Sequence, residues 1–273
     1  MSGTLYIVAT PIGNLEDISA RALRILGEVD LIACEDTRQT HKLLDRYGIS
    51  KPLVSYHEHN ERARAEELIG NLLAGKNIAL VSDAGTPLIA DPGYRLVELA
   101  REKGVAVSPI PGPSAILAAL SASGLATDTF CFRGFFASKT VQRRQFLEQM
   151  RHFPGTLVAY ETPHRVLETL EDIAEVLGPR PVVLARELTK VHEEFLRGTA
   201  AEIREVLAKR PSVKGEIVLM IGKSETGEVD DSPLEAAVEK LVEAGLSRME
   251  AFKTVARQRG ISKREVYKKL NER

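Results

Sequence analysis

The stretch LYIVATPIGN, residues 5–14, carries the pattern on which the fold prediction rests. Its first half, residues 5–9, is a short apolar run with the length and composition of a buried strand. Its second half, residues 10–14, contains the proline and glycine of a loop. A loop that follows a strand of an open α/β sheet lies at the carboxyl end of the strand, where such sheets bind ligands. Thr10 and Pro11 stand where a GxGxxG turn needs glycine, so the sequence disfavours a dinucleotide site of the Rossmann type.

Short apolar runs alternate with helical patterns from this stretch to about residue 222, which is typical of α/β folds. The predicted strands are residues 5–9, 31–34, 78–81, 105–110, 130–133, 156–160, 182–185, 195–197 and 216–221. The predicted helices are residues 20–26, 39–47, 60–74, 94–102, 113–123, 140–151, 165–177 and 200–209.

The pattern divides the chain into two α/β domains and a small helical appendage. The pattern of predicted strands and helices changes near residues 124–128. We therefore expect an N-terminal domain over residues 1–124 and a second one over 125–223. Residues 224–232 are polar and contain glycine, as linkers do. Residues 233–244, 248–259 and 263–271 follow as three short helical patterns, which form a small basic domain over residues 233–273 that resembles a helix-turn-helix.

The charge is distributed unevenly along the chain. Residues 246–273 carry nine Lys/Arg and three Asp/Glu, which gives +6. The other 245 residues carry 28 Lys/Arg and 35 Asp/Glu, which gives −7 and accounts for the net charge of −1. A basic tail on an acidic body suggests a polyanionic partner. A solvated helical surface is the alternative interpretation.

Several classes of protein are disfavoured by composition. No apolar run approaches the roughly 20 residues of a membrane span, and the N-terminus lacks the pattern of a signal peptide. Cys34 and Cys131 stand far apart and without a cluster of other ligands, which disfavours a disulfide framework and structural zinc. We therefore expect a cytoplasmic protein with no membrane span and no metal.

Two further loops with glycine and proline follow predicted strands. In SDAGTPLIADPG, residues 82–93, Asp83 can accept hydrogen bonds from a ligand, and Gly85 lets the backbone approach one. In PIPGPSA, residues 109–115, the start of a helix offers free N–H groups to a carboxylate. Each loop alone could be a plain connection or helix start. Together with residues 10–14 they meet at one edge of the predicted sheet and indicate a ligand site.

The residues of these loops resemble a known family. LYIVATPIGNLEDIS (5–19), IACEDTRQT (32–40), SYHEHNE (55–61), VSDAGTPLIADPG (81–93), PIPGPSA (109–115), ETPHR (161–165) and ARELTK (185–190) occur in this order. They resemble the tetrapyrrole-methylase superfamily, which includes corrin methylases and diphthine synthase. Within it they are similar to bacterial 16S ribosomal RNA (cytidine-2′-O)-methyltransferases. The resemblance runs from residue 5 to about residue 222 and into the tail.

This resemblance implies two α/β domains with S-adenosylmethionine in the cleft between them. It assigns the lining of the cofactor to Thr10, Pro11 and Ile12. It assigns the ribose or methionine part to Asp83, Gly85 and Thr86, with Ser114 and Ala115 at the helix start. From the second domain, residues around Tyr160 and Glu161, Leu188, and Glu216 with Ile217 would close over the adenine.

The reaction that the resemblance implies is methyl transfer to a cytidine 2′-hydroxyl of 16S rRNA in the 30S subunit, by a homodimeric enzyme. A general base could take the hydroxyl proton. Its candidates are Glu35, Asp36, His57, His59, Glu161, His164, Glu187 and a lysine such as Lys190, with Arg38 beside the first two.

Each candidate has another interpretation. Asp36 could simply cap the next helix, and Arg186 with Glu187 could form a salt bridge between the domains. His57 and His59 could bind a metal, but no third ligand is evident.

Basic residues offer contacts to RNA outside this site. Lys139, Arg143, Arg144 and Arg151 lie on one predicted helix of the second domain, Arg165 is available for a phosphate, and the tail adds its own positive charge. Two alternatives stay open: a methylase of corrin precursors, which would not need these residues, and a DNA-binding regulator with a small-molecule sensor domain.

Overall fold

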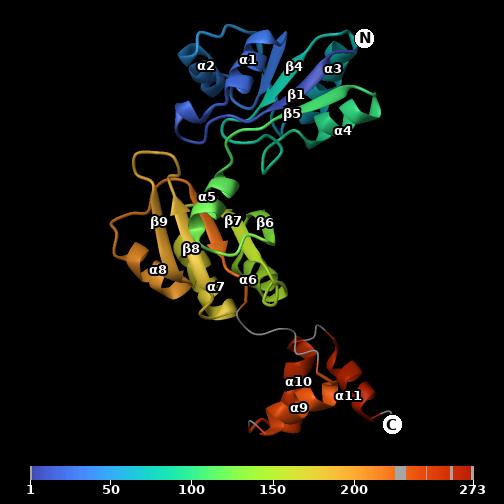
Figure 1. Cartoon of the computed structure of the whole chain (residues 1–273), viewed down its shortest axis with the longest axis vertical. Coiled ribbons are helices and arrows are strands. Elements are labelled where there is room, and N and C mark those ends of the chain that lie inside the picture. The colour runs from blue at the N-terminus through green and yellow to red at the C-terminus, as the bar shows by residue number, and fades with distance from the viewer. Residues whose placement is uncertain (1, 225–231, 244, 259–260, 272–273) are drawn as a thin grey trace.

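The computed structural model describes residues 2–224, 232–243, 245–258 and 261–271. Its first sheet has five parallel strands in the order β3-β2-β4-β1-β5. Figure 1 labels β4, β1 and β5 of this sheet. The strands are β1 (Thr4–Val8), β2 (Leu31–Cys34), β3 (Leu53–Ser55), β4 (Ile78–Val81) and β5 (Ala106–Ile110).

Helices cover both faces of this sheet, as expected when both faces of a parallel sheet must be buried. On one face α1 (Ala20–Glu28) and α2 (Thr37–Arg46) pack with buried residues such as Val8 and Ile32. On the other face α3 (Glu61–Leu73) and α4 (Tyr94–Glu102) pack with residues such as Leu5. Because all five strands run parallel, their carboxyl ends lie at the same edge of the sheet.

The second sheet is mixed, with the order β6-β7-β10-β8-β9. Its strands are β6 (Phe130–Phe135), β7 (Thr156–Glu161), β8 (Pro181–Arg186), β9 (Glu194–Thr199) and β10 (Ile217–Ile221). Of its strand pairs in the described residues, β6 and β7 are parallel, and the β7–β10, β10–β8 and β8–β9 pairs are antiparallel. One face carries α6 (Thr140–Gln149), α7 (Val166–Leu177) and α8 (Ala200–Ala208).

The other face of the second sheet carries α5 (Ala115–Ser123). Its buried residues Ile116, Ala119 and Leu120 pack on Val158, Val183 and other residues of β7, β8 and β10. The sequence assigns this helix to residues 1–124, but it packs with the second half of the chain. Where the domains divide stays a prediction. Over residues 2–224 the chain passes from one sheet to the other once, between β5 and α5.

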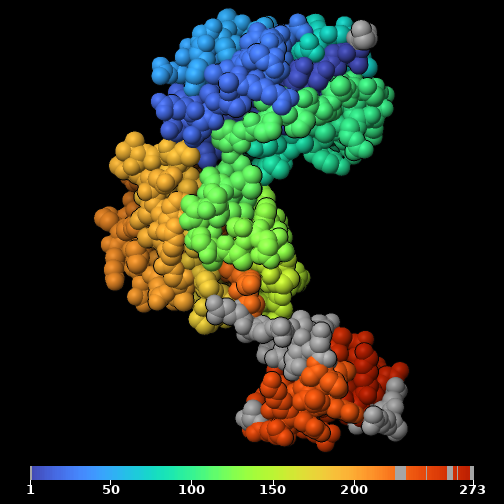
Figure 2. Space-filling view, in the orientation of Figure 1, coloured from blue at the N-terminus to red at the C-terminus, as the bar shows by residue number. Residues whose placement is uncertain are grey.

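Three C-terminal helices form a separate small core. They are α9 (Leu234–Glu243), α10 (Arg248–Gln258) and α11 (Lys263–Asn271), and Val238, Phe252 and Val266 are among the residues buried between them. Figure 2 shows them as a lobe of their own in orange and red. Residues 225–231, which make up most of the predicted linker, and residues 259–260 lie outside the described residues.

The predicted elements agree with the observed ones to within about three residues at their ends. All nine predicted strands and eleven predicted helices are present. The sequence missed β3 and the 3-10 helix Leu15–Asp17, each of which has three residues. Neither is long enough to show a hydrophobic period.

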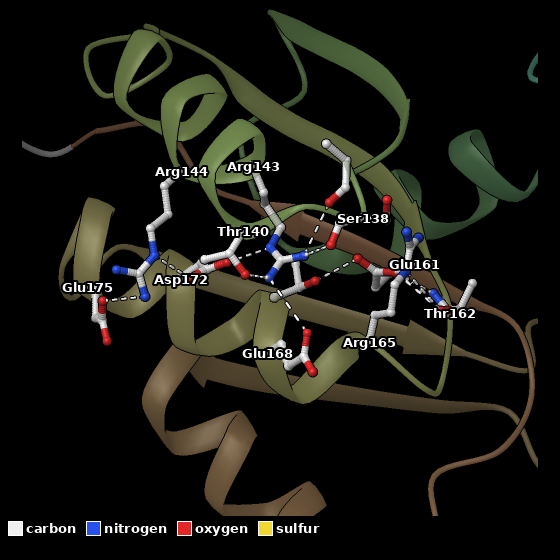
Figure 3. A network of polar contacts seen from close by, with 12 residues as sticks. Ser138, Thr140, Arg143, Arg144, Glu161, Thr162, Arg165, Glu168, Asp172 and Glu175 are labelled. Carbon is white, nitrogen blue, oxygen red and sulfur yellow. Dashed lines mark hydrogen bonds and ion pairs between the residues drawn. The ribbon is translucent and has the colours of Figure 1, made fainter.

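The prediction that the basic residues of α6 face RNA is wrong for Arg143. Its side chain is 1% exposed and pairs with Asp172 of α7 at 2.5 Å (Figure 3). Its guanidinium also donates to the carbonyl oxygens of Ala137 and Ser138. Arg144 pairs with Asp172 and Glu175, and Arg151 with Glu148. Arg143 therefore joins α6 to α7 and is not available to a phosphate.

Candidate functional site

A cavity of about 310 Å³ lies where loops of the two sheets meet. This volume is at the lower end of the range for small-molecule sites in proteins. The residues that line it come from both halves of the chain. They are Ile12, Ala84, Gly85, Thr86, Ile89, Ala90, Asp91, Ser114, Ala115, Phe135, Tyr160, Glu161, Thr162, Pro163, Leu188, Gly215, Glu216, Ile217 and Val218.

The loop after β1 is anchored to the loop after β4. The Thr10 and Gly85 backbones exchange two N–H···O=C hydrogen bonds of 2.8 and 3.0 Å. The hydroxyl of Thr10 donates to the carbonyl of Ser82 at 3.0 Å. Thr10 is 2% exposed and does not line the cavity, and neither does Pro11. Thr10 thus fixes the loop from which Ile12 reaches the cavity.

The loop after β4 carries strained backbone. Leu88 and Ala90 have φ of 72° and 68°, which is the left-handed region that favours glycine. Such residues cost on the order of 1–3 kcal/mol each and gather at functional sites. The hydroxyl of Thr86 donates to the carbonyl of Pro113 at 3.2 Å, which ties this loop to the start of α5. There Ser114 caps the helix and lines the cavity.

A second strained loop comes from the other sheet, between β8 and β9. Glu187 and Thr189 have φ of 52° and 65°, and Leu188 between them lines the cavity. The loop lies directly against the loop after β1. A Cβ added to Gly13 would be 2.6 Å from Cγ of Lys190 and 2.8 Å from Oγ1 of Thr189. Two loops from different sheets therefore touch beside the cavity.

Lys190 is an ammonium group held by two carboxylates. Its Nζ lies 2.9 Å from Oε1 of Glu187 and 2.9 Å from Oε2 of Glu216. Burial lowers the pKa of Lys190, but the hydrogen bonds to these two carboxylates outweigh it, so the pKa is raised. The hydrogen bond from Lys190 lowers the pKa of Glu187. Neither residue has the electrostatics of a general base near neutral pH.

The acidic residues after β2 lie beside the cavity and do not line it. Asp36 caps α2 and pairs with Arg38 at 2.6 Å, which lowers the pKa of Asp36 to about 2. Asp83 is exposed and accepts a 3.0 Å hydrogen bond from the Asp36 backbone N–H. Burial raises the pKa of Glu35, and the charge of Asp83 adds to the rise. Asp36 thus serves as the helix cap that the sequence offered as the alternative.

The walls from the second sheet include Tyr160 and Glu161. Burial, with the charges of Asp91 and Glu216, raises the pKa of Tyr160 to about 12. Glu161 is 3% exposed, and its carboxylate accepts a hydrogen bond from the Thr169 hydroxyl. It also accepts one from Arg165 (Figure 3). Arg165, which the sequence offered to a phosphate, is paired with Glu161, and its side chain is 25% exposed.

The remaining polar candidates lie apart from the cavity lining. His57 contacts Asn60 and the ring of His59, and His164 is exposed. Arg186 pairs with Glu194 in its own sheet rather than across the domains. Within the described residues there is no group of three or more His, Cys, Asp or Glu that could hold a metal.

The structure gathers most of the residues that the sequence assigns to a cofactor. Nine of the twelve line the cavity, and Thr10, Pro11 and Asp83 stand behind or beside it. The sequence missed Asp91, although it lies within the stretch SDAGTPLIADPG. It also missed Phe135, which only the arrangement of the second sheet brings to the cavity, whereas Thr162 and Pro163 lie in the quoted stretch ETPHR beside Glu161.

None of the helices in the described ranges is long and apolar enough to cross a membrane.

Comparisons with known proteins agree with this architecture. Residues 4–204 match the family model of the tetrapyrrole (corrin/porphyrin) methylases. The chain is 50% identical over 272 residues to ribosomal RNA small subunit methyltransferase I of Halalkalibacterium halodurans, covering 97% of this chain and 93% of the relative. It is 47% identical over 271 residues to the protein of the same name from Haemophilus influenzae, covering 98% and 96%.

A solved structure shares the fold. The uroporphyrin-III C-methyl transferase of Thermus thermophilus, complexed with S-adenyl homocysteine, matches 81% of this chain and 97% of its own. The TM-score is 0.57 at 20% sequence identity.

Proposed function

The chain belongs to the tetrapyrrole (corrin/porphyrin) methylase family, and from this membership and its relatives we infer that it methylates the ribosomal RNA of the small subunit. The identity of about half of all residues extends over nearly the whole length of both proteins. This full-length similarity to ribosomal RNA methyltransferases is the observation that carries the inference. It favours RNA as the substrate over a corrin precursor, because only the shared fold supports a corrin precursor.

The methyl donor is S-adenosylmethionine, which supplies a methyl group on a positively charged sulfur. The cavity fits such a molecule. Ile12, Leu188 and Ile217 offer apolar surface to an adenine, and the backbone around Gly85 and the helix start at Ser114 offer polar groups. We propose that Gly85, Thr86, Ser114 and Ala115 hold the ribose and methionine part. Tyr160, Leu188, Glu216 and Ile217 then cover the adenine, while Thr10 and Pro11 act by shaping the loop.

The protein's work in such a reaction is to position the two reactants, because the donor carries the reactive group. We propose that the acceptor is the 2′-hydroxyl of a cytidine in 16S rRNA. Loops from two sheets line the cavity, so closing them around the donor would exclude water from it. The proposed substrate is the rRNA within the 30S subunit, with the protein acting in the cytoplasm as a homodimer.

Methyl transfer to defined particles tests this function. Purified protein is incubated with methyl-labelled S-adenosylmethionine and 30S subunits from a strain that lacks the enzyme. We expect incorporation at one cytidine 2′-hydroxyl, mapped by nuclease digestion and mass spectrometry. Subunits from a strain that has the enzyme serve as the control and should accept little label. Absence of label in both free 16S rRNA and the unmethylated subunits would refute the function.

The oligomeric state is measured separately by light scattering of the purified protein. A mass near twice the 30.0 kDa of one chain is expected. A mass of one chain at micromolar concentration would refute the homodimer and leave the methylation unaffected.

A further inference from the structure

The loop between β8 and β9, residues 187–193, reaches the cavity through Leu188. Its backbone is strained on both sides of Leu188, because Glu187 and Thr189 have φ of 52° and 65°. For a residue other than glycine this left-handed conformation is less stable than an extended or helical one, and it persists only where surrounding contacts hold it. The contacts that hold this loop therefore decide whether Leu188 stays at the wall of the cavity.

The carboxylate of Glu187 joins this loop to the start of β10. Its Oε1 accepts hydrogen bonds from Nζ of Lys190 at 2.9 Å and from the backbone N–H of Glu216 at 3.0 Å. The backbone N–H of Glu187 donates to the carbonyl of Glu216 at 3.0 Å. Gly215 leaves room for the carboxylate, since a Cβ there would lie 2.5 Å from Cδ of Glu187. Gly215 and Glu216 line the cavity, so Glu187 fixes the loop against a second segment of the wall.

Lys190 extends this arrangement to the first sheet. Its stem passes Gly13, where an added Cβ would lie 2.6 Å from Cγ of Lys190. Its ammonium lies 2.9 Å from the carboxylates of both Glu187 and Glu216. The side chain of Glu187 is 20% exposed, whereas that of Glu216 is 76% exposed. Solvent screens the ion pair of an exposed carboxylate more strongly, so the pair with Glu187 is the stronger of the two.

We propose that the ion pair of Glu187 and Lys190 is a clasp that holds the strained loop in the conformation in which Leu188 lines the cavity. Neither Glu187 nor Lys190 lines the cavity itself, so both are positioning residues. The inference rests on the proposed function, because it takes the cavity as the site of S-adenosylmethionine. The clasp acts before the donor binds: it sets the fraction of protein molecules whose loop is in the binding conformation.

Loss of the clasp lowers this fraction and does not abolish it. Glu193 still holds the loop, because its Oε2 accepts a 2.7 Å hydrogen bond from the backbone N–H of Thr189. The apparent affinity for a ligand falls in proportion to the fraction of protein in the binding conformation, so a fraction of about one tenth weakens binding about tenfold. At saturating donor the loop is in the binding conformation in every molecule, and the rate of methyl transfer returns to that of wild type.

The test is Lys190→Met, which keeps an unbranched side chain beside Gly13 and removes the ammonium. Calorimetric titration should show S-adenosylmethionine bound about tenfold more weakly than by wild type. In methylation of 30S subunits the KM for the donor should rise by the same factor, and kcat should change by less than about threefold. Lys209→Met, at the C-terminal end of α8, removes an exposed lysine and is the matched control. It should bind the donor and transfer the methyl group as wild type does.

Hydrogen exchange measures the loop without the reaction. It is followed by mass spectrometry on a peptide that covers residues 187–193. Without donor, the amides of this peptide should exchange faster in Lys190→Met than in wild type, because the loop opens more often. Saturating S-adenosylmethionine should remove the difference, since the donor favours the conformation that it binds. Equal exchange in the two proteins without donor would contradict the clasp.

A double-mutant cycle isolates the pair. Glu187→Gln keeps an oxygen for the backbone N–H of Glu216 and removes the charge that holds Lys190. Each single variant should bind the donor about tenfold more weakly, and the variant with both substitutions should bind it about as weakly as either single one. The effects are not additive because both substitutions break the same contact.

Three further results would overturn the inference. One is a donor affinity of Lys190→Met within about twofold of wild type. Another is a kcat that falls by more than about tenfold while donor affinity is kept, because Lys190 would then act on the RNA or in the transfer step. The third is a loss of about 100-fold in the double variant, because the two residues would then act independently. Wild-type protein that binds the donor but methylates no rRNA refutes the proposed function alone, because calorimetry and hydrogen exchange still decide whether the clasp exists.

Discussion

The absence of a side chain at Gly13 allows the loop after β1 to approach the loop between β8 and β9 closely. A methyl group there would meet Lys190, Thr189 and the carbonyl oxygen of Leu188 at 2.6 to 2.9 Å. The loop that bears these atoms is already strained at Glu187 and Thr189, so it has little freedom to withdraw. Gly13 is therefore required by the neighbouring sheet rather than by its own backbone angles.

We predict that Gly13→Ala weakens binding of S-adenosylmethionine by about tenfold or more, because Ile12 and Leu188 can no longer approach across the cavity. Calorimetric titration measures this effect. The matched control is Gly27→Ala in α1, where an added Cβ meets no atom within 4 Å. It should leave affinity unchanged and stabilise the protein by about 0.5–1 kcal/mol, since alanine favours helices over glycine. Equal affinities in Gly13→Ala and wild type would contradict the predicted contact.

Glu194 illustrates a charge that contributes to stability alone. Two nitrogens of Arg210 contact its carboxylate at 2.8 and 2.5 Å, and Nε of Arg186 lies 3.0 Å away. These hydrogen bonds, that from Arg210 foremost, lower the pKa of Glu194 from 4.5 to about 2 against the opposing effect of burial. A depressed carboxyl pKa adds stability above the unfolded pKa, and this stability is lost as the pH falls toward the folded one.

We therefore expect the contribution of Glu194 to be complete at pH 6 and to diminish between about pH 4.5 and 2. Urea unfolding at pH 6 and pH 3 should show that Glu194→Gln costs more at pH 6, by about 1 kcal/mol after allowance for solvent screening. Glu205→Gln, on the exposed side of α8, is the control. A cost independent of pH would mean that the pair does not stabilise the fold through charge.

At the scale of elements, the sequence predicted what depends on local pattern. The strand 78–81 and the helix 94–102 were placed at their observed ends, because apolar runs and helix signals mark them directly. β3 was missed because three half-buried residues at a sheet edge carry too little pattern. The role of Arg143 was predicted wrongly because its partner Asp172 lies 29 positions away and only the packing of α6 on α7 brings them together.

The pairing of α6 with α7 through Arg143 is the basis of a stability prediction. The side chain of Asp172 is 3% exposed, so removing the cation leaves a buried carboxylate with Arg144 as its remaining ion-pair partner among the described residues. We expect Arg143→Met to destabilise the protein by about 3 kcal/mol, since breaking a buried pair costs this much. Arg151→Met, whose side chain is 32% exposed and pairs with Glu148, should cost under about 1 kcal/mol.

Thermal and urea unfolding measure both variants. Similar losses for Arg143→Met and Arg151→Met would show that the buried network contributes no more than a surface pair. RNA affinity should be equal in wild type and Arg143→Met wherever both are folded, because Arg143 is inside the protein.

At the scale of the whole molecule, the sequence predicted the loops of the first sheet beside the cavity more directly than the residues that the second sheet contributes to it. The loops after β1, β4 and β5 come from one parallel sheet, and their convergence follows from topology alone. The contribution of Phe135 depends on how a mixed sheet faces the first one, and no local pattern contains that information. The role of the basic tail likewise depends on how the C-terminal helices are combined with the rest of the protein, which no local pattern contains.

Truncation after Gly222 tests the tail. The helices α9 to α11 pack around a core of their own, so their removal should leave the cavity and its affinity for S-adenosylmethionine intact. We expect weaker binding to 16S rRNA and a shallower dependence of log K on log salt, by about 0.7–0.9 per lost phosphate contact. Lys253→Gln with Lys269→Gln, both on exposed positions, should give part of the same effect with the lobe in place. An unchanged salt slope after truncation would show that the lobe does not bind RNA.

The single passage of the chain between the sheets has a consequence for motion. The connection between β5 and α5 includes Ser114, which lines the cavity, so the segment about which the two sheets could rotate is also part of the site. A molecule bound in the cavity restrains the connection between β5 and α5, so this connection loses conformational entropy when the first ligand binds. A second ligand that needs both sheets in one orientation then meets an ordered protein and loses less entropy on binding. Donor and RNA would in this way favour each other's binding through the order of this connection, in addition to the contact that methyl transfer itself requires.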